Sequence, residues 1–416
     1  MAGTGFVVIA AAVFLWGVLS GRLERADLTA PIVFTVVGAL LHRAGLVHGD
    51  LAPETLKPLV EVTLVWVLFS DAARVRVHDL RDDVGLVVRL LAVGLPLTVL
   101  AGWGLAAWLF PGMGVWVSLL VGAALAPTDA ALGLPVVSNP VVPARVRRLI
   151  TVESGLNDGI VTPVVVIAIA GAAASGGHAG GALRELAIGV AVGVAVGFAG
   201  GWLLRWARGR GWAAEDFVGV AVLALALLAY ATALEVDGNG FVAAFCGGIA
   251  FGAAAGRLAE AELVFLEQAS GAVSLLVWLA FGAVAVPIVF DRLTWSLLLY
   301  AVLSLTAIRM VPVLLAVTGA GLDRHTVAFV GWFGPRGLAS LVFALLALEE
   351  LGGGADEAVA VIAVTVLLSV LAHGFTAAPL AARYGGAARG SAPAQGGAPD
   401  LPVRGLPGSR SSGAAA

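Results

Sequence analysis

The sequence predicts an all-α membrane protein that crosses the bilayer many times, and its composition is the first reason. Of 416 residues, 60% are apolar and 12% are charged, about half the charged share of a soluble domain, and the mean hydropathy is +1.00. This composition excludes a soluble enzyme and a disordered chain. A single cysteine, Cys246, excludes a disulfide framework, and a net charge of −3 does not favour nucleic acid.

The second reason is the spacing of the apolar runs. About thirteen runs of about 20 residues are bounded by charge, glycine or proline, which is the length that a transmembrane helix needs. The basic residues Arg22 and Arg25 follow the first run instead of preceding it, so we interpret it as a helix and not as a signal peptide. The predicted segments are 5–20, 28–46, 55–73, 84–110, 113–137, 147–174, 183–204, 215–235, 239–256, 263–289, 294–318, 326–348 and 357–381.

The arginines predict the orientation. Most of them lie in loops after odd-numbered segments and in the C-terminal tail, whereas loops after even-numbered segments carry only Arg43, Lys57, Arg184 and Arg292. Because basic loops stay in the cytoplasm, the N-terminus should lie outside and the C-terminus inside. We expect a transmembrane domain over 1–382 and a disordered cytoplasmic tail over 383–416, which is rich in glycine, alanine, serine and proline.

The fifth segment contains a predicted break. Residues 126–129 read Ala-Pro-Thr-Asp. Proline inside a helix frees a carbonyl, which a membrane tolerates only against protein, water or an ion. The loose carbonyls and the Thr128 hydroxyl are oxygen ligands of the kind that small cations prefer, and Asp129 follows directly. The other interpretation is a simple kink packed on a neighbouring helix.

The sixth segment carries the most informative polar group. Residues 151–158 read Thr-Val-Glu-Ser-Gly-Leu-Asn-Asp, so Ser154 and Asp158 share one helix face, while Asn157 lies on the adjacent stripe. Asp158 comes ten residues after Arg148, about 15 Å into the membrane at 1.5 Å per residue. An acid near the middle of a bilayer is expensive, so Asp158 is predicted to be functional.

The twelfth segment contains a second break. Residues 331–337 read Gly-Trp-Phe-Gly-Pro-Arg-Gly. Segments five and twelve run in opposite directions, and two antiparallel broken helices are typical of an inverted-repeat transporter. Buried Arg336 needs an acid, and we expect Glu153, which lies off the Asp158 face, to form a structural ion pair with it. Arg309, buried in the eleventh segment, could cap carbonyls or pair with an acid.

These groups predict a secondary transporter. A carboxyl group in a low-dielectric site can hold a proton or a cation but not both, so alternating access to Asp158 gives an antiporter. The chain has no nucleotide-binding Gly-x-x-x-x-Gly-Lys-Ser/Thr loop. An aspartyl protease using Asp129 and Asp158 leaves Arg336 unexplained, and a channel would need polar groups along a whole pore. A sodium/solute symporter of related fold is the nearest alternative. Asp71, which ends the third segment, is either a ligand or an interfacial cap.

The combined motifs resemble the monovalent cation/proton antiporters, specifically the NhaP-type sodium/proton exchangers, over about residues 5–382. The resemblance implies a thirteen-helix fold with inverted repeats in the cell membrane. It implies a core domain over roughly 84–174 and 294–381, with the remaining helices at a homodimer interface. No cofactor is expected beyond the transported ions.

The resemblance also implies roles for the site. It makes Asp158 the ion- and proton-binding residue, with Ser154 and the Thr128 backbone as further cation ligands, and it implies the Glu153–Arg336 pair. Asn157 in place of a second acid implies electroneutral exchange, because an amide carries no second proton. Sodium is the expected cation, with potassium and lithium left open. The chain departs from the family at Pro335, where many relatives have an apolar residue such as leucine, and at Ser70, where the family's third helix often has glutamate.

Overall fold

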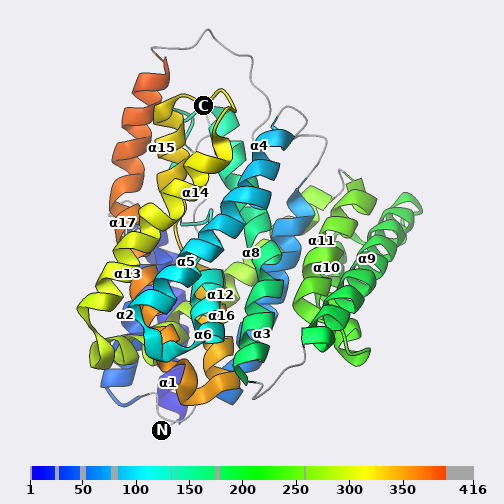
Figure 1. The fold of residues 1–416 in the computed structure, drawn as a ribbon. Helices are drawn as coiled ribbons and strands as arrows, with labels where there is room; N and C mark the ends of the chain where they lie inside the picture. The colour runs from blue at the N-terminus through cyan, green and yellow to red at the C-terminus, as the bar shows by residue number, and fades with distance from the viewer. Residues whose placement is uncertain are drawn as a thin grey trace.

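The computed structural model describes residues 2–23, 28–46, 53–75, 83–132, 134–137, 139–173, 179–256 and 259–389. Every regular element in these ranges is a helix, and none is a strand (Figure 1). Eight of the helices are long and apolar enough to cross a membrane. The predicted all-α membrane fold is therefore confirmed.

In the described part of the chain the helices follow the predicted segments closely and group into 13 helical passes. Helices α4 and α5 with the π-helical turn between them form one pass, α13 and α14 form another, and α6/α7 and α15/α16 are the two interrupted ones. The bounds are α1 (Ala2–Leu23), α2 (Ala30–Arg43), α3 (Pro53–Arg74), α4 (Val84–Arg89), α5 (Leu95–Leu109), α6 (Val115–Ala124), α7 (Leu134–Val137), α8 (Ala144–Ala173), α9 (Ala179–Gly209), α10 (Glu215–Glu235), α11 (Gly240–Ala255), α12 (Ala259–Arg292), α13 (Trp295–Leu305), α14 (Ala307–Val317), α15 (Arg324–Trp332), α16 (Leu338–Leu351) and α17 (Asp356–Arg389).

Both predicted breaks are present. Helix α6 ends at Ala124, and the chain then runs without helix through residues 125–132. Helix α15 ends at Trp332, and α16 begins only at Leu338. The first gap contains Pro127 and the second contains Pro335. Proline interrupts a helix because it cannot donate the backbone hydrogen bond that would continue it.

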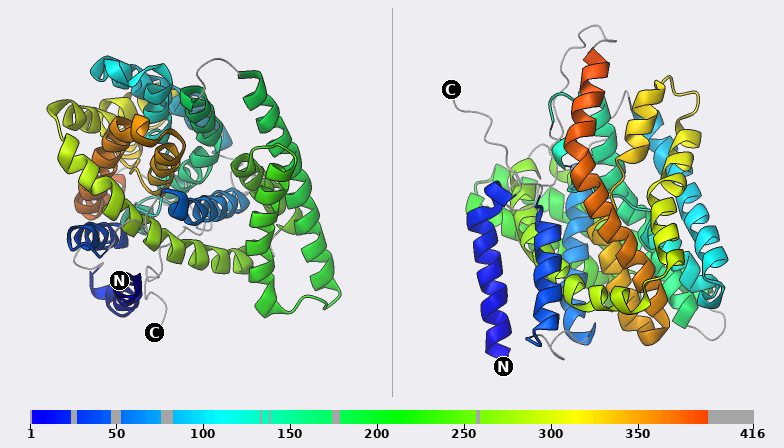
Figure 2. Two further views of the ribbon diagram at one scale, coloured as in Figure 1. Left: turned by 90° about the horizontal axis from the view of Figure 1, so that it is seen from below. Right: turned by 90° about the vertical axis from the view of Figure 1, so that its left-hand side faces the viewer.

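The first and last helices point to an odd number of passes. The N-terminal end of α1 and the C-terminal end of α17 lie at opposite ends of the bundle (Figures 1 and 2). The predicted tail is corrected at its start, since residues 383–389 belong to helix α17. Residues 390–416 lie outside the described ranges, as do several arginines that entered the orientation argument, among them Arg25, Arg76 and Arg81.

Helices α9, α10 and α11 form a group at one side of the molecule, and the long helix α12 runs across from α2 towards it (Figure 2, left). Within this group α9 and α11 touch along a stripe of glycines. A Cβ atom on Gly193 or Gly197 would overlap a backbone carbonyl oxygen of α11, and one on Gly189 would overlap that of Asn239, which precedes α11. Small residues at this spacing let two helix backbones approach within a membrane.

Candidate functional site: a crossing of two broken helices

The two non-helical segments cross and touch through their backbones. The Asp129 amide donates to the carbonyl oxygen of Pro335 at 2.8 Å. A Cβ atom on Gly334 would lie 2.9 Å from Cγ2 of Thr128, and one on Gly337 would overlap the Asp129 carboxylate. Glycine at these two positions is therefore what permits the crossing, because any side chain would separate the two segments.

Arg336 fills the space behind the crossing and is fully buried. Its guanidinium donates to the carbonyl oxygens of Ala126 and Pro127, the latter at 3.0 Å, and more weakly to Ser304 at 3.4 Å. The Ala126 and Pro127 carbonyls belong to the break that follows α6, and the Ser304 carbonyl belongs to α13. The positive charge of Arg336 is therefore opposed by backbone dipoles.

The predicted Glu153–Arg336 ion pair is wrong. Glu153 instead accepts two hydrogen bonds from Arg309 of α14, at 2.5 and 2.9 Å, and both side chains are buried. The two-pronged guanidinium–carboxylate geometry satisfies both oxygens and neutralises both charges, which is what a buried pair needs. Of the two roles expected for Arg309, capping carbonyls or pairing with an acid, the structure shows the second. Arg336 takes the first role and donates to backbone carbonyls.

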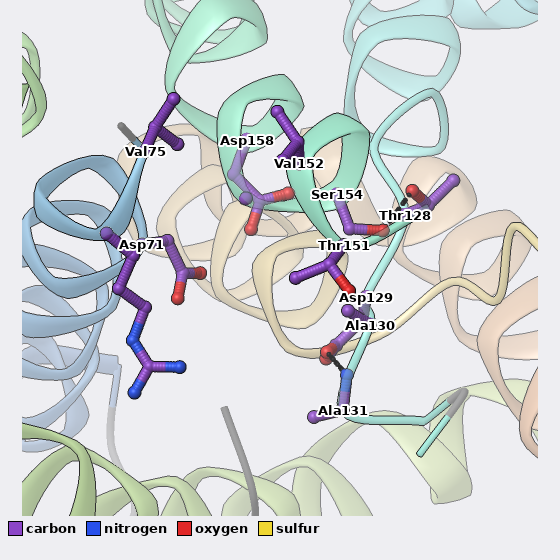
Figure 3. Close-up of a pocket in the computed structure, with 12 residues that line it drawn as sticks. Asp71, Val75, Thr128, Asp129, Ala130, Ala131, Thr151, Val152, Ser154 and Asp158 are labelled. Atoms are coloured by element: carbon purple, nitrogen blue, oxygen red, sulfur yellow. Dashed lines mark hydrogen bonds between the residues drawn. The ribbon is translucent and has the colours of Figure 1, made fainter. Parts of the chain in front are cut away.

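Asp158 lies midway along the 30-residue helix α8 and is 7% exposed. It borders a cavity of about 40 Å³, enough space for water or a small cation. Figure 3 shows Asp158, Ser154 and Thr128 beside this cavity, with Asp71 facing it from α3. The other lining residues are Arg74, Val75, Asp129, Ala130, Ala131, Thr151, Val152 and Gly155.

A hydrogen-bonded chain fixes the hydroxyl groups. Asn157, fully buried, donates through Nδ2 to Oγ1 of Thr128 at 2.8 Å. Thr128 Oγ1 also lies 2.8 Å from Oγ of Ser154. Because Thr128 Oγ1 already accepts from Asn157, its own proton can go to Ser154. The three polar groups therefore tie the first break to helix α8 next to Asp158.

Asp129 was expected to bind the ion, and the structure gives its carboxylate another task. One oxygen accepts from the backbone amide of Ala131 at 2.9 Å, and the other accepts from Leu338 at 3.2 Å. Leu338 is the first residue of α16, whose preceding residue Gly337 offers no capping side chain. Asp129 therefore caps α16 from another part of the chain, where the helix dipole favours a negative group.

Sequence reasoning missed three residues near the site. Arg74 lines the cavity one turn after Asp71 and forms an ion pair with Glu267 of α12. Their spacing of three residues on one helix could have indicated a shared face. Ser369 and His373 of α17 are buried and contact the second break. Polar residues inside the last apolar segment were the available signal.

Two antiporters align with most of this chain. It is 26% identical over 393 residues to the K(+)/H(+) antiporter NhaP of Alkalimonas amylolytica, covering 90% of this chain and 66% of that protein. It is 25% identical to the K(+)/H(+) antiporter NhaP2 of Shewanella oneidensis, covering 86% and 62%. The chain thus spans slightly less than two thirds of the length of these relatives.

A solved structure shares the fold. The sodium proton antiporter MjNhaP1 of Methanocaldococcus jannaschii at pH 8 matches with a TM-score of 0.75 and 19% identity, over 93% of this chain and 100% of that one. The family described as "Sodium/hydrogen exchanger, transmembrane" matches residues 8–383. This chain therefore belongs to the transmembrane sodium/hydrogen exchanger family.

Proposed function

We propose that this protein is a secondary active antiporter that exchanges protons for a monovalent cation at Asp158. The observation that supports this most directly is the buried carboxylate beside a small cavity that the oxygen-bearing side chains of Thr128 and Ser154 also line. Membership of the exchanger family supports the same conclusion. The site residues are thus Asp158, Ser154 and Thr128, with the cation as substrate.

The proposed exchange is a competition for one carboxylate. When Asp158 is protonated it is neutral and needs no counter-charge. When it is ionised, its negative charge in this buried environment is costly, and a cation beside it offsets that cost. Hydroxyl oxygens at Thr128 and Ser154 can replace part of the cation's hydration shell, since hard cations prefer oxygen ligands. Loading with a proton and loading with a cation therefore exclude each other.

We infer one-for-one exchange from Asn157. Its amide donates to Thr128 and carries no titrating proton. Asp129 has both oxygens engaged by backbone amides. In the proposed exchange Asp158 changes charge, and one proton replaces one monovalent cation without net charge movement.

Sodium is the cation we propose, since the solved neighbour is named a sodium proton antiporter. Potassium is the second candidate, since two relatives are named K(+)/H(+) antiporters. A sodium-coupled solute symporter would depend more on neutral ligands than on a titrating acid. Its activity would appear as solute uptake driven by sodium without proton movement.

The test is exchange in proteoliposomes that enclose a fluorescent pH indicator. Addition of sodium, lithium or potassium to acid-loaded vesicles should alkalinise the lumen. Asp158→Asn should abolish the signal, while the control Asp216→Asn, an exposed acid at the start of α10, should leave it intact. Clamping the membrane potential with valinomycin and potassium should not change the sodium-driven rate. Normal exchange by Asp158→Asn would refute the proposal.

We further propose that the protein is a homodimer in the cell membrane, with its N-terminus outside and its C-terminus in the cytoplasm. The distribution of arginines supports the orientation, and the family supports the membrane location. A fluorescent protein fused after residue 416 should fold and fluoresce in the cytoplasm. Native mass spectrometry from detergent should show twice the chain mass. A dark fusion would contradict the orientation, and a monomer mass would contradict the dimer.

A further inference from the structure

Helix α17 presents a polar stripe to the second broken helix. Ser369, His373 and Thr376 are spaced i, i+4 and i+7, which places them on one face. Ser369 and His373 are 0% and 1% exposed. None of the three is among the residues that line the cavity, and none entered the exchange mechanism above. We call these residues the α17 stripe.

The α17 stripe forms hydrogen bonds with Trp332, the last residue of α15. His373 Nε2 lies 2.9 Å from the Trp332 carbonyl oxygen and donates to it in the tautomer that carries the ring proton on Nε2. The Trp332 indole donates to Oγ1 of Thr376 at 3.0 Å. The Trp332 and His373 rings lie 5.2 Å apart at 31°. Both the backbone and the side chain of Trp332 are therefore held by α17.

The stripe also holds the far end of the same break. Ser369 Oγ accepts from the backbone amide of Arg336 at 2.7 Å. His373 Nδ1 lies 3.1 Å from that hydroxyl and 2.8 Å from the Ser369 carbonyl oxygen. Residues 333–337, which lie outside the helices α15 and α16, are thus held at both ends by one face of α17.

Holding this segment has a consequence at the cation site. The Arg336 guanidinium, whose backbone Ser369 fixes, donates to the carbonyl oxygens of Ala126 and Pro127. The next residue is Thr128, a proposed ligand. A displacement of the Arg336 backbone by a fraction of an ångström would move these contacts, because packed protein interiors transmit such shifts.

We propose that the α17 stripe, through His373 and Ser369, positions Arg336 and thereby sets the geometry of the cation site at Thr128. This inference rests on the proposed antiport function. His373 and Ser369 are positioning residues, since neither touches the cavity. Their loss should weaken cation binding and not only reduce the amount of folded protein.

Variants of His373 separate positioning from bulk packing. The Gln amide nitrogen can take the place of Nε2 and donate to Trp332, whereas the shorter Asn cannot reach it. We expect His373→Asn and His373→Leu to raise the apparent KM for sodium about tenfold, the effect of losing about one hydrogen bond. We expect His373→Gln to stay within about twofold of the unchanged chain. Rates are divided by the amount of monodisperse protein in the vesicles.

A second pair of variants covers the case in which the His373 variants do not fold. Ser369→Ala removes the hydroxyl that holds Arg336. Thr365→Val removes a buried hydroxyl one turn earlier that bonds only to Val361 of its own helix among the contacts described. A raised KM in Ser369→Ala with an unchanged KM in Thr365→Val supports the proposal.

Including Asp158→Asn in the same series distinguishes failure of the positioning role from failure of the antiporter assignment. Unchanged KM in His373→Leu, His373→Asn and Ser369→Ala, with Asp158→Asn inactive, overturns the positioning role and leaves the antiporter assignment standing. Exchange that survives in Asp158→Asn overturns the assignment itself, whatever the stripe variants do.

Discussion

The two broken helices meet at one point but contribute different chemistry. The first break supplies side-chain oxygens, the Thr128 hydroxyl at the cavity and the Asp129 carboxylate at α16. The second supplies Arg336 and two glycines that leave room for them. In the proposed exchange the first segment contributes to the cation site while the second supports it, although both are interrupted by proline. Two segments with the same kind of break can thus differ in their chemical roles.

The largest expected effect comes from removing the charge of the supporting break. Arg336→Leu leaves the Ala126 and Pro127 carbonyls unpaired, at about 1–3 kcal/mol for each. We expect a loss of about 3–5 kcal/mol in unfolding free energy, together with loss of transport. Thermal melting in detergent checks the loss of stability, and the proteoliposome assay checks the loss of transport. The control Arg292→Leu breaks a half-exposed ion pair to Asp356 and should cost less than about 1 kcal/mol. Equal losses in both variants would show that Arg336 has no special role.

The next effect comes from filling the space that the supporting break leaves free. Gly337→Ala places a methyl group against the Asp129 carboxylate. Overpacking of this kind costs about 1–3 kcal/mol, and it should also displace the cap on α16. The control is Gly353→Ala, where nothing lies within 4 Å of the added atom. Matching melting temperatures for the two alanine variants would contradict the close crossing.

A smaller effect is expected from the binding break itself. Thr128→Val removes the hydroxyl that accepts from Asn157 and contacts Ser154. The apparent KM for the cation should rise about tenfold, equivalent to about 1.4 kcal/mol, while Thr128→Ser should restore it. The measurement is a cation titration of exchange in proteoliposomes. A valine variant with unchanged KM would remove the Thr128 side chain from the set of ligands.

The smallest effect concerns the outer end of the second broken helix, which has a local cap. Asp323 accepts from the amides of His325 and Thr326, and the Thr326 hydroxyl bond lowers the pKa of this carboxyl. Asp323→Ala should cost about 0.5–1 kcal/mol. Because the folded pKa is depressed, this contribution is present above about pH 4 and disappears as the pH falls through the lowered value. Melting temperatures of both proteins, followed from neutral pH into the acid range, should therefore converge as the pH falls through the lowered pKa of Asp323. A gap that does not narrow at all as the pH falls would contradict an ionised cap.

The fold was predictable because its signals are local. A run of about 20 apolar residues needs no knowledge of its neighbours to be recognised, and a proline interrupts a helix wherever it lies. Ser154 and Asp158 share a face by helical periodicity alone, and the structure places both at the cavity. The break near Thr128 followed from residues 126–129 in the same way.

The partner of Glu153 was not predictable from periodicity. Helical spacing correctly placed Glu153 away from the Asp158 face, but two buried arginines, Arg309 and Arg336, were available on other segments. Which one reaches Glu153 depends on how α14 lies against α8, and a single sequence does not encode that rotation. The carbonyls that receive Arg336 were also invisible, since backbone acceptors leave no mark in side-chain patterns. The role of Asp129 as a cap for α16 was missed for the same reason, since its partners are backbone amides.

The glycine contact between α9 and α11 has a mechanical consequence. Where two backbones touch with no side chains between them, there is no soft layer that can shear or reorient. These helices should behave as one stiff plate during the transport cycle. Helices that slide past one another should then do so at surfaces where larger side chains separate the backbones. A disulfide engineered between α9 and α11 should therefore leave the rate of cation/proton exchange unchanged.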